Sequence, residues 1–320
     1  MILDLAVSFN KLYYSIKPLV PASIRRGVRR WFALKKRAQM QNVWPILPGS
    51  ERQPEGWRGW PDGKKFAFVL THDVEGPGGL AKCRQLMEVE KKWGFRSSFN
   101  FIPEGDYTAD RELREELARD GFEVGIHDLH HDGKLYRSRE AFAQYAARIN
   151  HYIKEWGADG FRAGFMFHNL DWQTDLEILY DASTFDTDPF EPQPDGAGTI
   201  FPFWKECPNG RGFVELPYTL PQDSTLFLLF RETTPAIWIE KLDWVARHGG
   251  MALINVHPDY LDYDSTALSE GKFPASWYAQ LLEHVATRYP GKYWSCLPRE
   301  LAVWYTGTMV PSRRRQAPVP

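Results

Sequence analysis

A chain of 320 residues that is 43% hydrophobic and 25% charged can bury the core of one large domain or of two ordinary ones. This balance excludes an intrinsically disordered chain and a polytopic membrane protein. The longest aliphatic and aromatic run, Leu226 to Phe230, is far shorter than the roughly 18 residues that a membrane-spanning helix needs.

The three cysteines and the first residues bear on the compartment. Cys83, Cys207 and Cys296 are an odd number at wide spacings, which predicts neither a disulfide framework nor a thiolate metal site. The first 14 residues lack the basic start, the sustained apolar run and the cleavage site of a secretory signal. We therefore expect a cytoplasmic protein with reduced thiols.

The N-terminal arm is basic, whereas the rest of the chain is acidic. Residues 1–38 contain nine Lys or Arg and one Asp, so the arm carries a net charge of +8 and the remainder −10. Residues 24–40 have the pattern of a short basic amphipathic helix, which can dock on the acidic body or lie on an anionic membrane. Docking is the expected role, and contact of residues 11–38 with the inner membrane surface is the alternative. Nucleic-acid binding is not expected, because no nucleic-acid-binding motif accompanies the charge.

Beyond a linker rich in Pro, Gly and Trp (residues 45–63), short apolar runs alternate with helical patterns. The alternation predicts an α/β fold in which a parallel sheet, covered by helices, closes into a barrel. The expected strands are 66–70, 97–102, 124–127, 161–163 and 252–256, and the expected helices are 80–93, 110–119, 139–156, 235–248 and 276–289.

Two segments do not follow the alternation. Residues 185–222 are dense in Pro, Gly and Asp, which predicts a long ordered loop at one wall of the site, with a further strand over 212–216. The chain from Thr306 is expected to be a disordered tail. The predicted organisation is an arm and linker (1–62), a catalytic barrel (63–305) and a tail (306–320).

In a parallel βα barrel the active site lies where the strands end. Asp73 and Glu75 follow the first strand two residues apart, so their side chains point to the same side of extended backbone. Two crowded carboxylates need a neutralising cation, and one can ligate it while the other acts as a base. Alone, such a pair is more often two solvated loop acids.

Histidines follow the third strand. His127 and His131 have the spacing that places two imidazoles on one face of a helical turn, which suits a divalent metal. Two histidines and one carboxylate form a zinc site that leaves a position for water. His130 competes with His131, because a spacing of three residues from His127 shares the same face.

Two further residues follow predicted strands. A buried Arg162 needs an acidic partner, for which Asp73 is the candidate, although a plain inter-loop salt bridge is an equal alternative. His257 follows the strand at 252–256 and is a candidate general acid or, alternatively, a histidine that only caps the strand.

Together these segments resemble the polysaccharide deacetylase (NodB homology) family over about residues 65–260. The resemblance rests on Thr71-His72-Asp73-Val74-Glu75, on His127-x-x-x-His131, on the Arg162 motif and on Ile254-Asn255-Val256-His257. It implies a distorted (β/α) barrel of about seven strands that hydrolyses N- or O-acetyl groups of carbohydrates with a divalent metal, for which zinc is expected.

The resemblance also implies roles. Asp73 matches the general base, Glu75 the acidic ligand, His127 and His131 the metal-binding histidines, Arg162 the residue that orients the base, and His257 the general acid. Three departures accompany it. The acidic ligand is displaced by one residue, Arg162-Ala163-Gly164-Phe165 replaces Arg-x-Pro-Tyr, and the aspartate that supports His257 is open among Asp186, Asp188 and Asp223. In the family the backbone N–H at the Tyr position of this motif helps to stabilise the oxyanion, and the backbone N–H of Phe165 stands at that position.

The expected function is therefore metal-dependent removal of an acyl group, with N-acetyl expected, from a carbohydrate or related metabolite. Trp172 and Trp204 are, with Phe165, the candidate aromatic residues of the substrate groove. Hydrolysis of another non-peptide C–N bond, as in ureides, is the alternative within the enzymes. A non-catalytic module that acts through the basic arm at a membrane surface or in an assembly is the alternative outside them.

Overall fold

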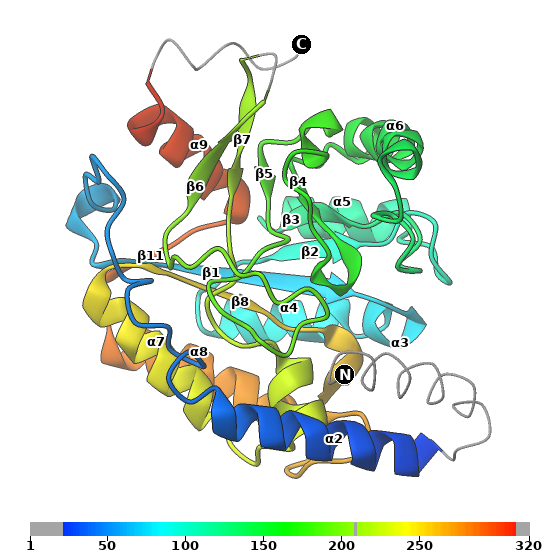
Figure 1. Ribbon diagram of the computed structural model, residues 1–320, viewed down its shortest axis with the longest axis vertical. Coiled ribbons are helices and arrows are strands. Elements are labelled where there is room, and N and C mark those ends of the chain that lie inside the picture. The colour runs from blue at the N-terminus through cyan, green and yellow to red at the C-terminus, as the bar shows by residue number, and fades with distance from the viewer. Residues whose placement is uncertain (1–21, 208–209, 312–320) are drawn as a thin grey trace, which may run out of the picture. The chain divides into compact units, whose positions relative to one another are not determined.

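The computed structural model describes residues 22–207 and 210–311 (Figure 1). The chain divides into two compact units, Met1–Gln41 and Asn42–Pro320. In the first unit, helix α2 (Ala22–Gln39) confirms the predicted basic helix, and its Trp31 and Phe32 side chains are exposed. The rest of the predicted arm, residues 1–21, lies outside the described residues. Within the described ranges, every helix is too short or too polar to cross a bilayer.

The second unit is built around a nine-stranded sheet whose neighbouring strands are parallel, except for an antiparallel β6–β7 pair. The order is β11-β1-β2-β3-β4-β5-β7-β6, and β8 pairs with β1 on the side away from β2. A short parallel pair, β9–β10, lies outside it. The strands are β1 (Phe66–Val74), β2 (Ser98–Phe101), β3 (Glu123–His127), β4 (Gly160–Arg162), β5 (Tyr180–Asp181), β6 (Phe203–Glu206), β7 (Gly212–Glu215), β8 (Met251–Asn255), β9 (Leu261–Asp262), β10 (Phe273–Pro274) and β11 (Tyr293–Ser295).

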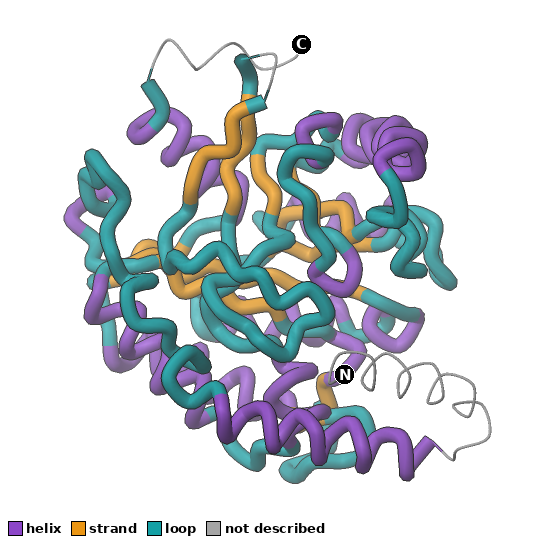
Figure 2. Tube along the Cα trace, viewed as in Figure 1, coloured by secondary structure: helices purple, strands orange, loops and turns teal. Residues whose placement is uncertain are grey.

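Helices connect the strands and cover the sheet from outside, as the tube in Figure 2 shows. The helices are α3 (Pro77–Leu80), α4 (Cys83–Lys92), α5 (Arg111–Arg119), α6 (Arg139–Trp156), α7 (Ala236–His248), α8 (Ala275–Arg288) and α9 (Pro298–Met309), with a π-helical segment at Ser224–Phe230. Local sequence explains the bounds of α6. The Ser138 hydroxyl accepts the N–H of Ala141 at its start, and Gly157 ends it in a left-handed conformation.

The sheet closes only in part, which makes the barrel distorted. All nine residues of β1 are buried, as expected for a central parallel strand. On the far side of the curved sheet, the N–H groups of Thr219 and Leu220 donate to the carbonyl of Leu253 in β8. Isolated hydrogen bonds thus bridge the gap that a full strand pair would fill in a regular barrel.

Several elements differ from the predictions. The predicted loop at 185–222 also contains β6, which pairs with β7. Three further elements, β5, β11 and α9, were not predicted. Helix α9 extends to Met309, so the expectation of disorder from Thr306 is wrong for its first residues, and residues 312–320 lie outside the described ones. Tyr305 is buried there, and burial of such a ring favours continuing the helix. All three cysteines are free thiols.

Candidate functional site

Asp73 lies on β1, one residue before the strand ends, and is almost completely buried. The side-chain amide of Asn100 donates to its Oδ1 at 2.9 Å and that of Asn255 to its Oδ2 at 2.7 Å. Burial raises the pKa of this carboxyl, but the positive charges of Arg162 and His257 and the hydrogen bond from Asn100 oppose burial, and the pKa lies below its ordinary value. Asp73 is therefore held as a carboxylate.

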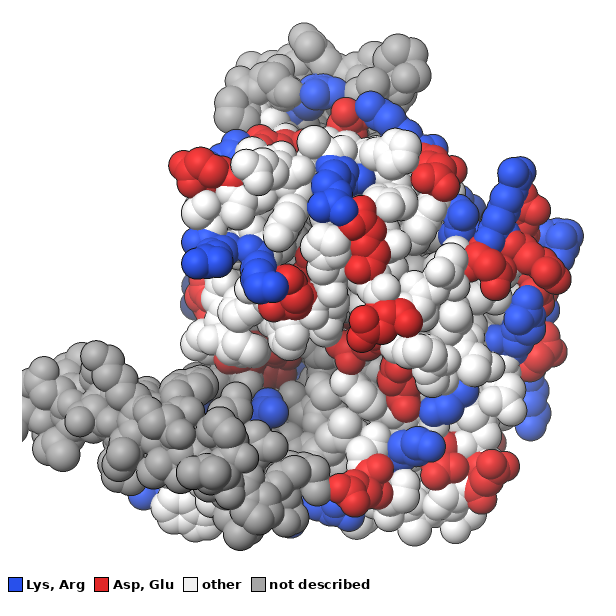
Figure 3. All heavy atoms as spheres, turned by 90° about the vertical axis from the view of Figure 1, so that its right-hand side faces the viewer, with Lys and Arg blue, Asp and Glu red and all other residues white. Residues whose placement is uncertain are grey.

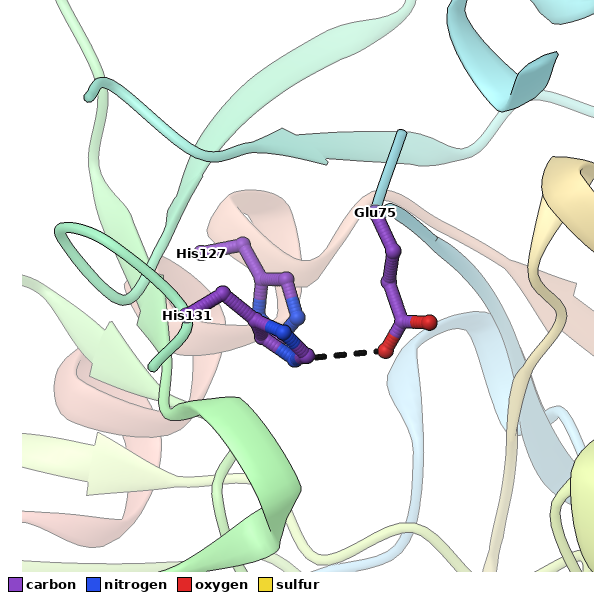
Figure 4. A group of neighbouring side chains, drawn as sticks. All are labelled: Glu75, His127 and His131. Atoms are coloured by element: carbon purple, nitrogen blue, oxygen red, sulfur yellow. Dashed lines mark ion pairs between the residues drawn. The ribbon is translucent and has the colours of Figure 1, made fainter. Parts of the chain in front are cut away.

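Glu75, His127 and His131 form a cluster at the ends of β1 and β3 (Figure 4). Their ligand atoms all lie within 4.8 Å of one another. The two imidazoles lie beside each other and face the carboxylate, with His131 Nε2 at 3.2 Å from Glu75 Oε1. Glu75 lies two residues beyond Asp73 and one residue past the end of β1. His127 lies near both carboxylates, which therefore point to the same side, as predicted.

The histidine loop is not a helical turn, which corrects the reason given for the spacing of its imidazoles. β3 ends at His127, and Asp128 and His131 both have positive φ, 58° and 52°. Gly164 makes room for this loop, since a Cβ there would lie 2.6 Å from Asp128 Oδ2 and 2.8 Å from His131 Cδ2. Two left-handed residues bring His131 back over His127, and the competing His130 points instead to Glu104.

His127 has the protonation state of a ligand. Its Nδ1 lies 3.1 Å from the carbonyl oxygen of Arg162, which can only accept, so Nδ1 carries the proton and Nε2 keeps its lone pair. Burial lowers the pKa of His127, which favours the neutral ring. Nε2 is buried, and no other group in the described part of the chain hydrogen-bonds to it. A divalent cation bound by this atom, His131 and Glu75 would satisfy it, so the residues fit such an ion.

Arg162 is completely buried at the end of β4. Its Nη2 donates to the hydroxyl of Thr71 at 3.0 Å, and its Nε lies 3.6 Å from Asp73 Oδ1. A buried guanidinium needs a nearby negative charge, which Asp73 supplies. The predicted pairing of Arg162 with Asp73 is thus present as a close approach.

His257 follows β8 and is oriented by Asp223, at the start of the π-helical segment. Asp223 Oδ1 lies 2.7 Å from the ring Nδ1, and Oδ2 accepts the backbone N–H of the same histidine at 2.7 Å. Burial opposes protonation, but Asp223 and Glu75 raise the pKa of His257 to about 10. Among the three aspartates left open by the sequence, Asp223 contacts His257; Asp186 pairs with Lys241, and Asp188 accepts from Tyr218.

Of the three candidate aromatic residues, Phe165 lies at the cluster, and Trp172 and Trp204 pack elsewhere. Phe165 stacks on the ring of His131, with centroids 4.5 Å apart, and is 43% exposed. Trp172 packs against Tyr136 and Phe142 in the core beside α6. Trp204 lies in β6, where its ring lies against Gly212. Their place in a substrate groove stays a prediction.

The strand β1 points toward the side of the molecule that faces the viewer in Figure 3. Over the described part of that side, acidic and basic side chains are interspersed rather than gathered by sign. Such a surface favours no strong electrostatic steering of a highly charged substrate.

Comparisons with known proteins identify the fold. No family model matches the chain, and no curated protein matches it in sequence. A candidate polysaccharide deacetylase from Mycobacterium smegmatis superposes with a TM-score of 0.61 at 20% identity, over 84% of this chain and 99% of that one.

Two further structures share the fold. A second candidate polysaccharide deacetylase, from Pseudomonas aeruginosa PAO1, has a TM-score of 0.57 at 11% identity, over 79% of this chain and 95% of that one. The allantoinase Puue has a TM-score of 0.56 at 13% identity, over 79% and 94% of the two chains. The protein is thus an α/β protein with the distorted barrel that the resemblance implied.

Proposed function

We propose that this protein is a metal-dependent deacetylase that hydrolyses an acetyl group, with N-acetyl expected, from a carbohydrate or related metabolite. Glu75, His127 and His131 would hold a divalent cation, for which zinc is expected from the ligand set. The observation that carries the proposal is the unpartnered, buried Nε2 of His127, which faces a carboxylate and a second imidazole beside the ionised Asp73.

A bound cation would polarise the acyl carbonyl and make a water more acidic at neutral pH. The proposed role of Asp73 is to accept the proton of the attacking water. Asn100 and Asn255 direct N–H donors at its two oxygens, so the carboxylate is fixed in position before the substrate binds. Arg162 adds a positive charge that keeps Asp73 ionised.

The leaving group needs a proton, and His257 is positioned to donate one. Its Nδ1–H is directed at Asp223, so the proton to be donated is the one on Nε2, the nitrogen that lies 3.7 Å from Glu75 Oε1. The raised pKa keeps the ring protonated at neutral pH. We assign the oxyanion contact to the backbone N–H of Phe165, where left-handed conformations at Phe165 and Met166 turn the chain beside His131.

A second substrate class is a ureide, whose hydrolysis breaks a C–N bond with the same groups. The similar fold of an allantoinase supports including it. Exposed apolar side chains of α2, which include Trp31 and Phe32, support the membrane-surface alternative, and sedimentation with anionic vesicles tests it.

The test combines elemental analysis of the purified protein with an acetate-release screen over N- and O-acetylated sugars, and with a parallel screen of ureides. We expect one equivalent of a divalent cation, acetate release that a chelator abolishes, and its loss in Asp73→Asn. Asp106→Asn, an exposed aspartate, is the matched control and should keep full activity. Cation-free protein without hydrolase activity on either class would refute the proposal.

A further inference from the structure

The turn after His257 is bonded to the segment that carries Glu75. One oxygen of Asp259 accepts the backbone N–H of Glu75 at 2.9 Å, and the other accepts that of Gly79 at 2.9 Å. The ammonium of Lys82 donates to the carbonyl oxygens of three residues of the turn, Pro258, Asp259 and Leu261, at 2.8–3.2 Å. The two segments, 180 residues apart in sequence, therefore form one bonded unit.

Within this unit Tyr260 contacts the carboxylate of Glu75. Its hydroxyl donates to Glu75 Oε2 at 2.7 Å, and its ring packs beside that of His257 with centroids 4.9 Å apart. The other oxygen, Oε1, faces His131 at 3.2 Å and His257 at 3.7 Å. Tyr260 thus occupies one oxygen and leaves the second for the histidine cluster.

The hydroxyl is a permanent donor. An ordinary phenol has a pKa of about 10 and keeps its proton at neutral pH, so the Tyr260 hydroxyl donates to the Glu75 carboxylate. Without this donor the carboxylate could rotate and present both oxygens to a cation. Groups that hydrogen-bond to a metal ligand fix its orientation, and their removal typically weakens metal affinity about 10–100-fold.

We propose that Tyr260 is a positioning residue that holds Glu75 as a ligand with a single oxygen directed at the cation. The inference rests on the proposed metal centre, and none of the sequence motifs includes this tyrosine.

The test measures zinc affinity of the full-length protein by competition with a chromophoric chelator, without reference to activity. Tyr260→Phe is expected to bind zinc about 10–100-fold more weakly than the wild type. Tyr263→Phe is the matched control, because the Tyr263 hydroxyl is buried in the same region and has no hydrogen-bond partner among the described residues. The control should bind zinc as the wild type does.

The outcomes separate the two proposals. A wild-type protein that binds no zinc refutes the metal centre itself. If the wild type binds zinc and folded Tyr260→Phe binds it with the same affinity, only the role of Tyr260 is refuted. X-ray absorption of the zinc-loaded wild type gives a second measurement that needs no variant. We expect a carboxylate bound through one oxygen, and one bound through both would overturn the inference.

Discussion

The pairing of His257 with Asp223 can be tested by Asp223→Asn, which removes the charge but keeps the size and one acceptor oxygen. Both side chains are buried, and Asp223 contacts the ring and the backbone N–H of His257 at 2.7 Å each. Only the contact with the ring depends on protonation of the histidine. The amide nitrogen of Asn would face the backbone N–H of His257 and remove that contact in both protonation states, so the change in the pKa comes from the contact with the ring.

The size of the effect follows from this geometry. Replacing a charge-assisted hydrogen bond by a neutral one removes about 1–2 kcal/mol. The Coulomb attraction of two charges about 4 Å apart, at an effective dielectric constant of about 20, sets an upper limit of about 4 kcal/mol. At about 1.4 kcal/mol per pKa unit, the pKa of His257 should fall from about 10 by roughly 1–3 units. Loss of the same free energy in the transition state would slow hydrolysis about 10–1,000-fold.

The assay is an NMR titration of the histidine ring protons in metal-free protein, with the His257 signal identified by its absence in His257→Gln. Asp243→Asn is the control, because Asp243 contacts His284 at 2.7 Å in a pair outside the site. An unchanged His257 midpoint in Asp223→Asn would refute the assignment of the raised pKa to Asp223.

The same shift has a signature in stability. The folded pKa of about 10 lies above the ordinary value of 6.5, so the folded state binds the proton more tightly. The resulting stabilisation is complete below about pH 6.5 and is lost as the pH rises toward 10. Denaturant unfolding of the metal-free protein should show this decline, and in Asp223→Asn the decline should end at a lower pH.

Two further predictions concern stability. The Tyr218 hydroxyl lies 3.0 Å from Asp188 Oδ2 and 2.9 Å from Glu191 Oε1, and its one proton can be donated to only one of them at a time. Burial raises the pKa of Asp188 to about 7 and that of Glu191 to about 8. The folded state holds these protons more tightly than the unfolded chain does, so the free energy of unfolding should fall as the pH rises from about 4 to neutral. Denaturant unfolding should show a smaller fall in Asp188→Asn. A Cβ at Gly79 would lie 2.1 Å from a carboxylate oxygen of the neighbouring turn, so Gly79→Ala should cost about 1–3 kcal/mol of unfolding free energy. Gly78→Ala, with open space at its Cβ, should cost less, and equal costs would contradict the close approach.

Elements with a long and regular pattern could be predicted from the sequence. The observed α6, Arg139–Trp156, has the predicted bounds because Ser138 and Gly157 are strong start and stop signals. β5 and β11, of two and three residues, are too short to show a period. β6 is partly exposed and pairs with β7 through contacts that no local pattern encodes.

The candidate site was predictable where chemistry lies at the end of a strand. Asp73 and His127 are within the last two residues of β1 and β3, Glu75 and His257 lie one and two residues beyond β1 and β8, and the structure brings the four side chains together. The spacing of the histidines was informative for a different reason from the one given, because positive φ angles at Asp128 and His131, and not a helical turn, place the imidazoles. Spacing alone could not separate His130 from His131, since both offsets suit a helical face.

The supporting groups depend on strand register, which is a property of the folded sheet. Asn100 lies beside Asp73 because β1 and β2 pair in that register, and a shift by one residue would turn its amide to the other face of the sheet. Tyr260 reaches Glu75 only because β8 lies next to β1, which brings the turn at 258–261 to the end of β1. A sequence can therefore show which residues carry out the chemistry, since their types and positions after strands are local. The residues that orient them are ordinary Asn and Tyr, whose role arises only from the neighbours that the fold supplies.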